Sequence, residues 1–573
     1  MTQMYYGAPD LYVHTDWIKQ MLGGKFFSSG VYPFGMHNMI AAHSRIFGIN
    51  VITCMRLYGV LFSFFIVLSV YLLMQKMFQS RNAVNIGFLI FSVSNIVTQR
   101  VWWRQAFSLP QEAGIIFLLP CGIFLFEYIK TKEIKHLAFF SMALFMMVSM
   151  HFYVAIAVMF MLGAIFIVNI TDIIKSKIFL KIVFAGLISL ALTVGTLVVP
   201  NLLGVRWEGS MGWALRVLSS AGDQSESVTE PLESMESENP DEIDQRPFKE
   251  KLADAVQKSS EELSLDIHVY LIFIAGTIVM TLYSLVIIMF FAKKRYYGKF
   301  LLAMALYSIF FFMLSIGYEL GFPEIIEKPR LAEFFGNNYG FMIAIFIEIF
   351  MIPFLTVKFF RKIRPVMFVL IFAAFGYYVF MTGFQLNSRM RVFQYQYNST
   401  IQSYYKIVNR FPKNKFTIVS SVDELCMVRG LGWHYELSDL IYELAENDSD
   451  GKINMPTDDV LIFIEKRPIR PGRLNDPVTG FEFSSERPVS VADAKKDTLV
   501  MKDSLKDEWN LAYTVYENRR IIMSKAYYWM QEYKNYFKQE IYTFYEDDDI
   551  IVYHLRQLDP YVLNNLYIDY KYN

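Results

Sequence analysis

The chain has 573 residues, of which 54% are hydrophobic and 19% are charged, and its formal net charge is zero. Soluble proteins carry about 25% charged residues, so this composition is too apolar for an ordinary soluble protein. Because there is no basic excess, no electrostatic field would recruit nucleic acid.

Residues 1–51 precede the first long apolar segment and are rich in aromatic, His and Asp residues. They contain the stretch Gly7-Ala8-Pro9-Asp10-Leu11-Tyr12-Val13-His14-Thr15-Asp16-Trp17 and then Tyr32-Pro33-Phe34-Gly35-Met36-His37. Tyr and Trp often anchor segments at the membrane–water interface, which explains part of this pattern. Anchoring alone does not predict an acid flanked by Pro and aromatics, followed by a Tyr-Pro-x-Gly-x-His turn.

Ten apolar segments follow between residues 52 and 384. A helix crosses a membrane with about 20 apolar residues, because every backbone polar group must be paired within the segment. The fourth segment is short enough for a buried or re-entrant helix. We count it as spanning, because the connections rich in Lys and Arg then all lie on one side of the membrane. The segments are Ile52–Met74, Ala83–Thr98, Ala113–Tyr128, Leu137–Met150, Phe152–Ile170, Ile178–Pro200, His268–Phe291, Phe300–Ile316, Tyr339–Val357 and Val366–Phe384.

Lys and Arg residues gather in alternate connections between these segments, which core helices of a soluble protein would not explain. The positive-inside rule makes the side that carries them cytoplasmic. Residues 1–51, the loops 201–267 and 318–337, and the chain after residue 385 are then predicted to lie outside. The basic groups are Lys76 and Arg81; Lys130, Lys132 and Lys135; Lys175, Lys177 and Lys181; Lys293, Lys294, Arg295 and Lys299; and Lys358, Arg361, Lys362 and Arg364.

Both ends of the chain lie outside in this topology, although nothing before Tyr5 could serve as a signal peptide or an anchor. We therefore expect a further N-terminal transmembrane helix to precede this sequence in the natural protein. The outer domain contains a single cysteine, Cys426, so it has no disulfide framework. This cysteine usage fits a bacterial cell envelope.

The loop 201–267 contains an acid-rich tract from Asp223 to Asp244, with no Lys or Arg before Arg246. Charge of one sign and low hydrophobicity predict disorder. The tract could order over a bound substrate, but a solvated tether explains it as well, and we assign it no chemistry.

Residues 386–573 are predicted to form a separate α/β domain that is large enough for its own core. Apolar runs at Phe416–Val419, Val460–Ile464 and Ile550–Tyr553 predict buried strands. We expect a helix to begin within residues 432–440 and a long helix over residues 504–536. The cluster Trp433-His434-Tyr435-Glu436 either packs inside the domain, which we favour, or faces an acceptor glycan, because aromatic rings stack on sugars.

A second polar cluster, Arg100-Val101-Trp102-Trp103-Arg104-Gln105-Ala106-Phe107-Ser108-Leu109-Pro110-Gln111-Glu112, lies at the next predicted outer turn. Glu112 is its only carboxylate. Together, the first-loop Asp, the Tyr-Pro-x-Gly-x-His turn and this cluster resemble GT-C-type glycosyltransferases. That group includes oligosaccharyltransferase catalytic subunits, protein mannosyltransferases and many bacterial enzymes, and its donor is a polyprenyl-linked sugar.

The resemblance covers residues 1–385 and implies roles for particular residues. The essential first-loop acid of the family matches Asp10, with Asp16 as a weaker alternative. The second acidic motif of the family matches Glu112, although the family often has two acids there and this turn has one. The resemblance also implies that Asp10 and Glu112 could hold a divalent cation, Mg²⁺ or Mn²⁺, and the missing second acid weakens that expectation.

Transfer of a glycosyl group from a lipid phosphate needs a base for the acceptor and cations for the departing phosphate. Asp10 is the candidate base, because partial desolvation at the membrane boundary raises a carboxyl pKa toward a useful value. Glu112 would assist. Arg330 is a phosphate candidate, because a guanidinium fork matches phosphate oxygens, but it could instead pair with Glu327 or Glu333. The remaining candidates for substrate binding are Arg104, also for the phosphate, and His14, Asp16, His37 and His151.

Several motifs are absent from the sequence. It has no phosphate-binding Gly-x-x-x-x-Gly-Lys-Ser/Thr loop, no HExxH or paired Cys/His zinc spacing, and no Gly-x-Ser-x-Gly elbow. Acids within the apolar segments are rare, with Glu127 and Glu348 the nearest exceptions, whereas ion-coupled transporters usually need them at the midplane.

The predicted fold is a polytopic α-helical membrane domain of about ten spans followed by an extracytoplasmic α/β domain. The predicted function is transfer of a sugar from a polyprenyl-linked donor to an envelope glycan, lipid or protein acceptor on the outer face of the cell membrane. The alternative is a non-catalytic protein, either a lipid-linked glycan translocase or a membrane assembly scaffold. Convergence of Asp10 and Glu112 on one outward cavity would favour the enzyme.

Overall fold

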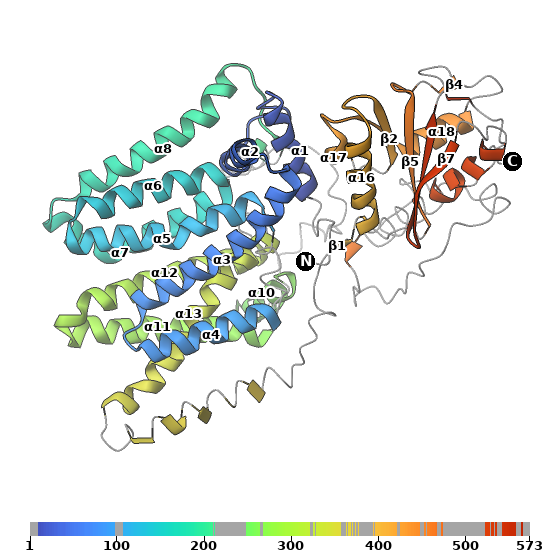
Figure 1. The fold of residues 1–573 in the computed structure, drawn as a ribbon. Coiled ribbons are helices and arrows are strands. Elements are labelled where there is room, and N and C mark those ends of the chain that lie inside the picture. Colours follow the sequence, from blue (N-terminus) through green and yellow to red (C-terminus); the bar gives the residue numbers. More distant parts are fainter. Residues whose placement is uncertain are drawn as a thin grey trace. The chain divides into compact units, whose positions relative to one another are not determined.

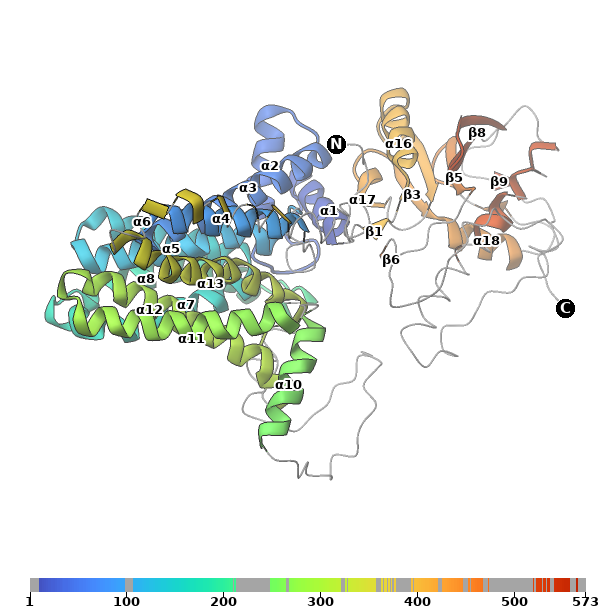
Figure 2. The ribbon, with the colours of Figure 1, turned by 90° about the horizontal axis from the view of Figure 1, so that it is seen from below.

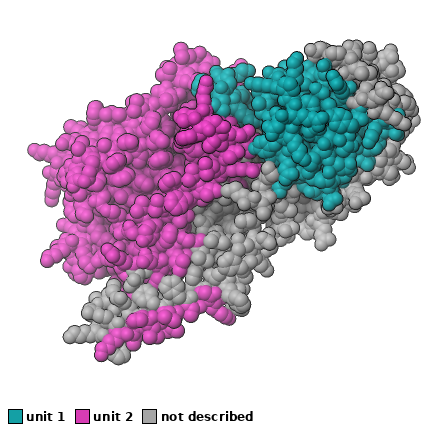
Figure 3. Space-filling model, in the orientation of Figure 1, with its two compact units in different colours: residues 1–26, 227–242, 391–573 teal, residues 27–226, 243–390 magenta. Residues whose placement is uncertain are grey.

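The structure, a computed structural model, divides into two compact units, which Figure 3 shows in teal and magenta. We call Phe27–Glu226 with Ile243–Met390 the helical unit, and Met1–Phe26 with Ser227–Glu242 and Arg391–Asn573 the sheet unit. The structure describes residues 10–97, 107–209, 211–212, 248–263, 267–320, 325–326, 328–356, 393–394, 396–420, 425–446, 452–453, 455–466, 472–473, 541–556 and 563–564, together with short pieces within 362–377 and 519–535.

The helical unit is a bundle whose successive helices are joined mostly by short turns (Figure 1). The amphipathic helix α10 points away from the direction of the long helices, as Figure 2 shows. The helices are α2 (Gly35–Phe47), α3 (Val51–Met77), α4 (Arg81–Val97), α5 (Pro110–Thr131), α6 (Ile134–Met150), α7 (Phe152–Lys175), α8 (Phe179–Leu202), α10 (Phe248–Glu262), α11 (Ile267–Phe290), α12 (Arg295–Gly317) and α13 (Lys328–Thr356), with short 3₁₀ turns η2 (Ala292–Lys294) and η3 (Tyr318–Leu320).

The long helices have the composition and surface of membrane-embedded helices. In the part of the chain that the structure describes, seven helices are long and apolar enough to cross a membrane: α3, α5, α7, α8, α11, α12 with η2, and α13. Helix α6 is apolar but shorter. Only 17% of the most apolar stretch of α8 is buried. Leu180, Phe184 and Leu202 of this helix are strongly exposed. So large an apolar surface is unfavourable in water but suited to lipid.

Nine of the ten apolar segments predicted from the sequence coincide with helices α3 to α8 and α11 to α13. Helices are expected there because a membrane span must pair its backbone polar groups internally. The tenth segment, Val366–Phe384, lies largely outside the described residues, and so does the acidic tract Asp223–Asp244. The number of spans and their orientation stay predictions.

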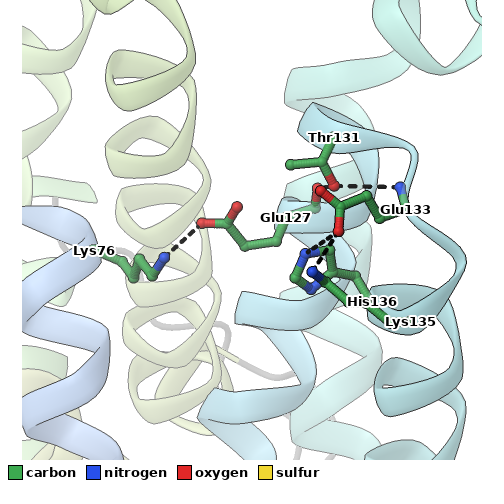
Figure 4. Close-up of polar contacts among 6 residues, drawn as sticks. All are labelled: Lys76, Glu127, Thr131, Glu133, Lys135 and His136. Carbon is green, nitrogen blue, oxygen red and sulfur yellow. Dashed lines mark hydrogen bonds and ion pairs between the residues drawn. The ribbon is translucent and has the colours of Figure 1, made fainter.

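Basic side chains form ion pairs at one end of the bundle, which we call the lysine end. Lys76 of α3 reaches Glu127 of α5 (2.8 Å), and Lys299 of α12 reaches Asp172 of α7 (2.6 Å). Figure 4 shows the neighbouring α5–α6 turn, where Glu133 accepts from Lys135 at 2.5 Å. The Lys76–Glu127 and Lys299–Asp172 pairs join helices that are far apart in the sequence.

The sheet unit has a five-stranded mixed sheet of order β3-β2-β5-β8-β7. Strand β2 pairs in parallel with β3 and β5, whereas β8 pairs antiparallel with β5 and β7. Apolar side chains such as Val419, Ile462 and Trp529 form the core on the sheet. The elements are α1 (Asp10–Leu22), β1 (Phe393–Gln394), α16 (Asn398–Arg410), β2 (Phe416–Ser420), α17 (Leu425–Val428), β3 (Trp433–Glu436), α18 (Leu437–Glu446), β4 (Lys452–Ile453), β5 (Asp459–Glu465), β6 (Gly472–Arg473), β7 (Ile541–Glu546), β8 (Ile550–Arg556) and β9 (Leu563–Asn564).

The three predicted strands are confirmed as β2, β5 and β8. The predicted helix start within residues 432–440 is confirmed, because α18 begins at Leu437. The residues directly before it, Trp433–Glu436, form strand β3, which was not predicted. Aromatic residues favour strands, and here they pair with β2. Of the predicted helix 504–536, only pieces between 519 and 535 are described, and these are helical.

Candidate functional site

Helix α5 begins at the end of the bundle opposite the lysine end, and its first turn is buried. Pro110 starts the helix, where its missing N–H removes no hydrogen bond. The side chain of Glu112 follows in the first turn and is fully inaccessible, at 0% exposure. An acid in this position interacts favourably with the helix dipole. Burying a carboxylate is costly unless it is paired or protonated, so a fully buried acid at this position is unusual.

A hydrogen-bonded clasp links this turn to the start of α13. Gln111 donates from Nε2 to Glu333 Oε2 at 2.8 Å, and the same nitrogen approaches the backbone oxygen of Arg330 at 3.3 Å. Gln111 and Glu333 are both buried, whereas Arg330 is half-buried. The clasp therefore holds Arg330, the predicted phosphate ligand, in the helical unit that also contains Glu112.

The predicted residues His37 and His151 both contact the same aromatic ring. The Tyr32 ring lies edge-on to His37 (centroids 5.9 Å apart) and to His151 (6.3 Å). His151 caps α7 by accepting the Tyr153 N–H at Nδ1 (3.2 Å). Since Nδ1 accepts, the neutral ring carries its proton on Nε2.

A close backbone approach explains the glycine of the Tyr-Pro-x-Gly-x-His turn. A Cβ on Gly35 would lie 2.7 Å from the backbone oxygen of Ser149, in the last turn of α6. A side chain at this position would separate α2 from the α6–α7 turn. Gly35 therefore allows the contact that brings His37 near His151.

The other predicted site residues, Asp10, His14 and Asp16, lie on α1 in the sheet unit. Asp10 is the first residue of the helix and is half-buried, while His14 is buried edge-on to Trp17 with centroids 5.2 Å apart. Asp16 accepts hydrogen bonds from Gln20 and from Arg429. Burial raises the pKa of the Asp16 carboxyl, and Arg429 opposes that shift.

The structure thus gathers the candidate residues into two sets. His37, Glu112, His151 and Arg330 belong to the helical unit, and Asp10, His14 and Asp16 belong to the sheet unit. Arg104 lies outside the described residues. Convergence of Asp10 and Glu112 stays a prediction. Within the described part of the chain, no three His, Cys, Asp or Glu side chains form a group that could hold a metal ion.

Sequence reasoning missed Gln111 and the partner of Asp16. Gln111 stood directly beside Glu112 at a helix start, so its place next to a predicted acid was the available signal. The pairing of Asp16 with Arg429 joins residues 413 positions apart, and no local pattern reveals it.

No family model matches the chain, and no curated protein matches it either.

Proposed function

We propose that the protein is a membrane glycosyltransferase that moves a sugar from a polyprenyl-linked donor to an envelope acceptor on the outer face of the cell membrane. The observation that carries the proposal is the buried acid and amide clasp at one end of an apolar bundle. There, Glu112 is enclosed, and Gln111 of α5 bonds to Glu333 and to the backbone oxygen of Arg330, both on α13. This end lies opposite the lysine end, which the positive-inside rule assigns to the cytoplasm.

The roles of the residues follow from their exposure. Arg330 and Asp10 are half-buried and can meet a substrate, so they take the phosphate and the acceptor. Glu112 and His37 are inaccessible, so we assign them positioning roles. A guanidinium such as that of Arg330 can bind a phosphate group in a bidentate manner.

In the proposed step, Asp10 takes the proton of the acceptor hydroxyl. At the same time the hydroxyl oxygen forms a bond to the anomeric carbon of the sugar. The bond between that carbon and the phosphate oxygen breaks, and both electrons leave with polyprenyl phosphate. Arg330 stabilises the charge that develops on the departing phosphate. The transfer reaction conserves atoms and charge and needs no redox partner.

The decisive experiment measures sugar transfer in reconstituted membranes, from polyprenyl-phosphate sugars to envelope lipid extracts. Asp10→Asn should lower the transfer rate by about 10²–10⁴-fold, the usual contribution of a general base. Asp439→Asn is the matched control, because it removes an acid from the first turn of another helix, α18. The control variant should keep the wild-type rate.

Survival of transfer in Asp10→Asn would remove Asp10 as the base. If folded wild-type protein transfers no sugar from any donor, the glycosyltransferase proposal is wrong, and the non-catalytic translocase or scaffold replaces it. Parallel reactions with EDTA test metal dependence, which stays a separate prediction.

A further inference from the structure

The sheet unit contains a pocket at the start of strand β3 that the transfer chemistry does not use. Its volume is ≈ 430 Å³, and it is lined by Asn414, Arg429, Gly430, Gly432, Trp433 and His434. This volume falls within the range of about 300–1,000 Å³ that is typical of small-molecule sites. All six residues belong to the same unit.

Two turns with unusual backbone conformations build the pocket walls. Asn414 has φ +62° and Gly430 has φ +82°, a region in which Gly and Asn are the favoured residues. The Asn414 N–H donates to the Leu431 oxygen at 2.7 Å and joins the two turns. A Cβ on Gly432 would lie 2.4 Å from the Phe416 ring, so this wall packs directly on the core. The pocket is thus held by the fold.

Trp433 is the exceptional side chain of this pocket. It starts β3, the edge strand of the sheet, and is 52% exposed. Large aromatic side chains usually bury most of their surface, so a half-exposed Trp beside a pocket is a candidate binding platform. Beside the indole, Asn414 offers a side-chain amide, while His434 is already bonded at Nε2 to the Ser420 hydroxyl at 3.0 Å. The sequence-based preference for packing of this cluster is therefore wrong for Trp433.

The charge of the pocket favours a neutral ligand. Among the lining residues that the structure describes, Arg429 is the only Lys or Arg, and it forms an ion pair with Asp16 of α1. Lys19, also on α1, donates to the Met427 oxygen at 2.6 Å, so α1 braces the turn that carries Arg429. Because a carboxylate already neutralises this guanidinium, an anion would gain little from it. Its remaining N–H groups can still donate to hydroxyl oxygens.

We propose that this pocket binds a neutral carbohydrate, with a sugar ring stacked on Trp433 and its hydroxyls bonded to Asn414 and Arg429. A ring with apolar C–H faces and a polar rim matches an aromatic platform surrounded by hydrogen-bonding groups. The assignment of this sugar as the acceptor glycan rests on the proposed function. The binding itself does not.

The test measures binding of neutral trisaccharides to the full-length protein by isothermal titration and saturation-transfer NMR. Maltotriose, cellotriose, mannotriose and triacetylchitotriose are suitable probes. The detergent must lack a sugar headgroup, because a maltoside would compete for the pocket. We expect saturable binding of at least one probe that weakens by at least about tenfold in Trp433→Ala, since an aromatic contact contributes about that much. Trp433→Phe should retain part of the affinity.

Tyr542→Ala is the matched control, because Tyr542 is another exposed aromatic residue of the same sheet, on β7. It should bind as the wild type does. The proposal is wrong if the wild type binds no probe, if Trp433→Ala binds with unchanged affinity, or if inorganic phosphate displaces the sugar. Displacement by phosphate would identify an anion site instead.

Binding is measured without a donor, so its outcome is separate from that of the transfer assay. If both proposals hold, Trp433→Ala should raise KM for the acceptor and leave kcat unchanged, the behaviour expected when ground-state and transition-state binding are lost equally.

Discussion

His554 illustrates how burial sets the behaviour of a single titratable residue in the sheet unit. It lies in β8, is nearly inaccessible, and contacts the rings of Phe411 and Tyr542. Its Nε2 donates to Asp459 Oδ1 at 2.7 Å. Burial lowers the pKa of His554 from its ordinary value of 6.5, and Asp459 only partly opposes that shift. The folded chain therefore prefers the neutral ring.

This preference predicts a loss of stability in mild acid. In the unfolded chain His554 takes up a proton near pH 6.5, before it does so in the folded chain. The stabilisation is thus present above pH 6.5 and is lost as the pH falls toward the lower folded pKa, by at most about 1.4 kcal/mol per pH unit. Thermal unfolding at pH 7.5 and 5.5 should show a smaller decrease in Tm for His554→Gln, which keeps a donor for Asp459 but cannot titrate. Equal decreases in both proteins would contradict this account.

At the scale of elements, glycines set how closely the helices of the bundle approach. A Cβ on Gly87 of α4 would lie 2.8 Å from the Cβ of Ala344 on α13, and a Cβ on Gly276 of α11 would lie 2.6 Å from that of Met342. Small residues permit such contacts in membranes, where packing rather than water drives helix association. By contrast, no atom lies within 4 Å of a Cβ placed on Gly186 of α8.

Substitution of these glycines should therefore have unequal effects. Gly87→Leu inserts a branched side chain where there is no space, and we expect it to destabilise the bundle by about 1–3 kcal/mol, the usual cost of overpacking. Gly186→Leu makes the same chemical change on an open helix face and should be nearly neutral. Unfolding of purified protein in increasing dodecyl sulfate gives the comparison. A larger loss for Gly186→Leu would show that α8 packs against a partner there.

At the scale of the whole molecule, the two ends of the helical unit differ in chemistry. The lysine end carries ion pairs such as Lys76–Glu127 and Lys299–Asp172. The opposite end carries the enclosed Glu112 and the two histidines around Tyr32. This asymmetry predicts the orientation of the bundle, with the lysine end toward the cytoplasm.

Single cysteines test that orientation in intact cells. Lys135 and Leu203 are both exposed, the first in the first turn of α6 and the second directly after α8. With Cys426 changed to Ser, a membrane-impermeant maleimide should label Leu203→Cys from outside and Lys135→Cys only after permeabilisation. Cys54 and Cys121 are buried and should contribute little background. The reverse labelling pattern would invert the topology and move Glu112 away from the outer face.

Helices and strands that depend on interactions between residues close in the chain could be predicted from the amino-acid sequence. A membrane span pairs its backbone within about 20 residues, so apolar runs alone located α3 to α8 and α11 to α13. The buried strands β2, β5 and β8 were equally visible as short apolar runs. Strand β3 was not, because its conformation depends on pairing with β2 and exposes Trp433.

Which polar groups contact each other depends on tertiary packing and could not be predicted from the sequence. Asp16, which was predicted to bind substrate, pairs with Arg429, 413 positions away, and Gln111 bonds to Glu333 across 222 positions. An acid or amide written in a sequence shows what it can bond, but its partner depends on how distant elements pack. The burial of a side chain also depends on packing between distant elements. Neighbouring helices enclose Glu112, whereas Trp433 stays exposed on the edge strand β3.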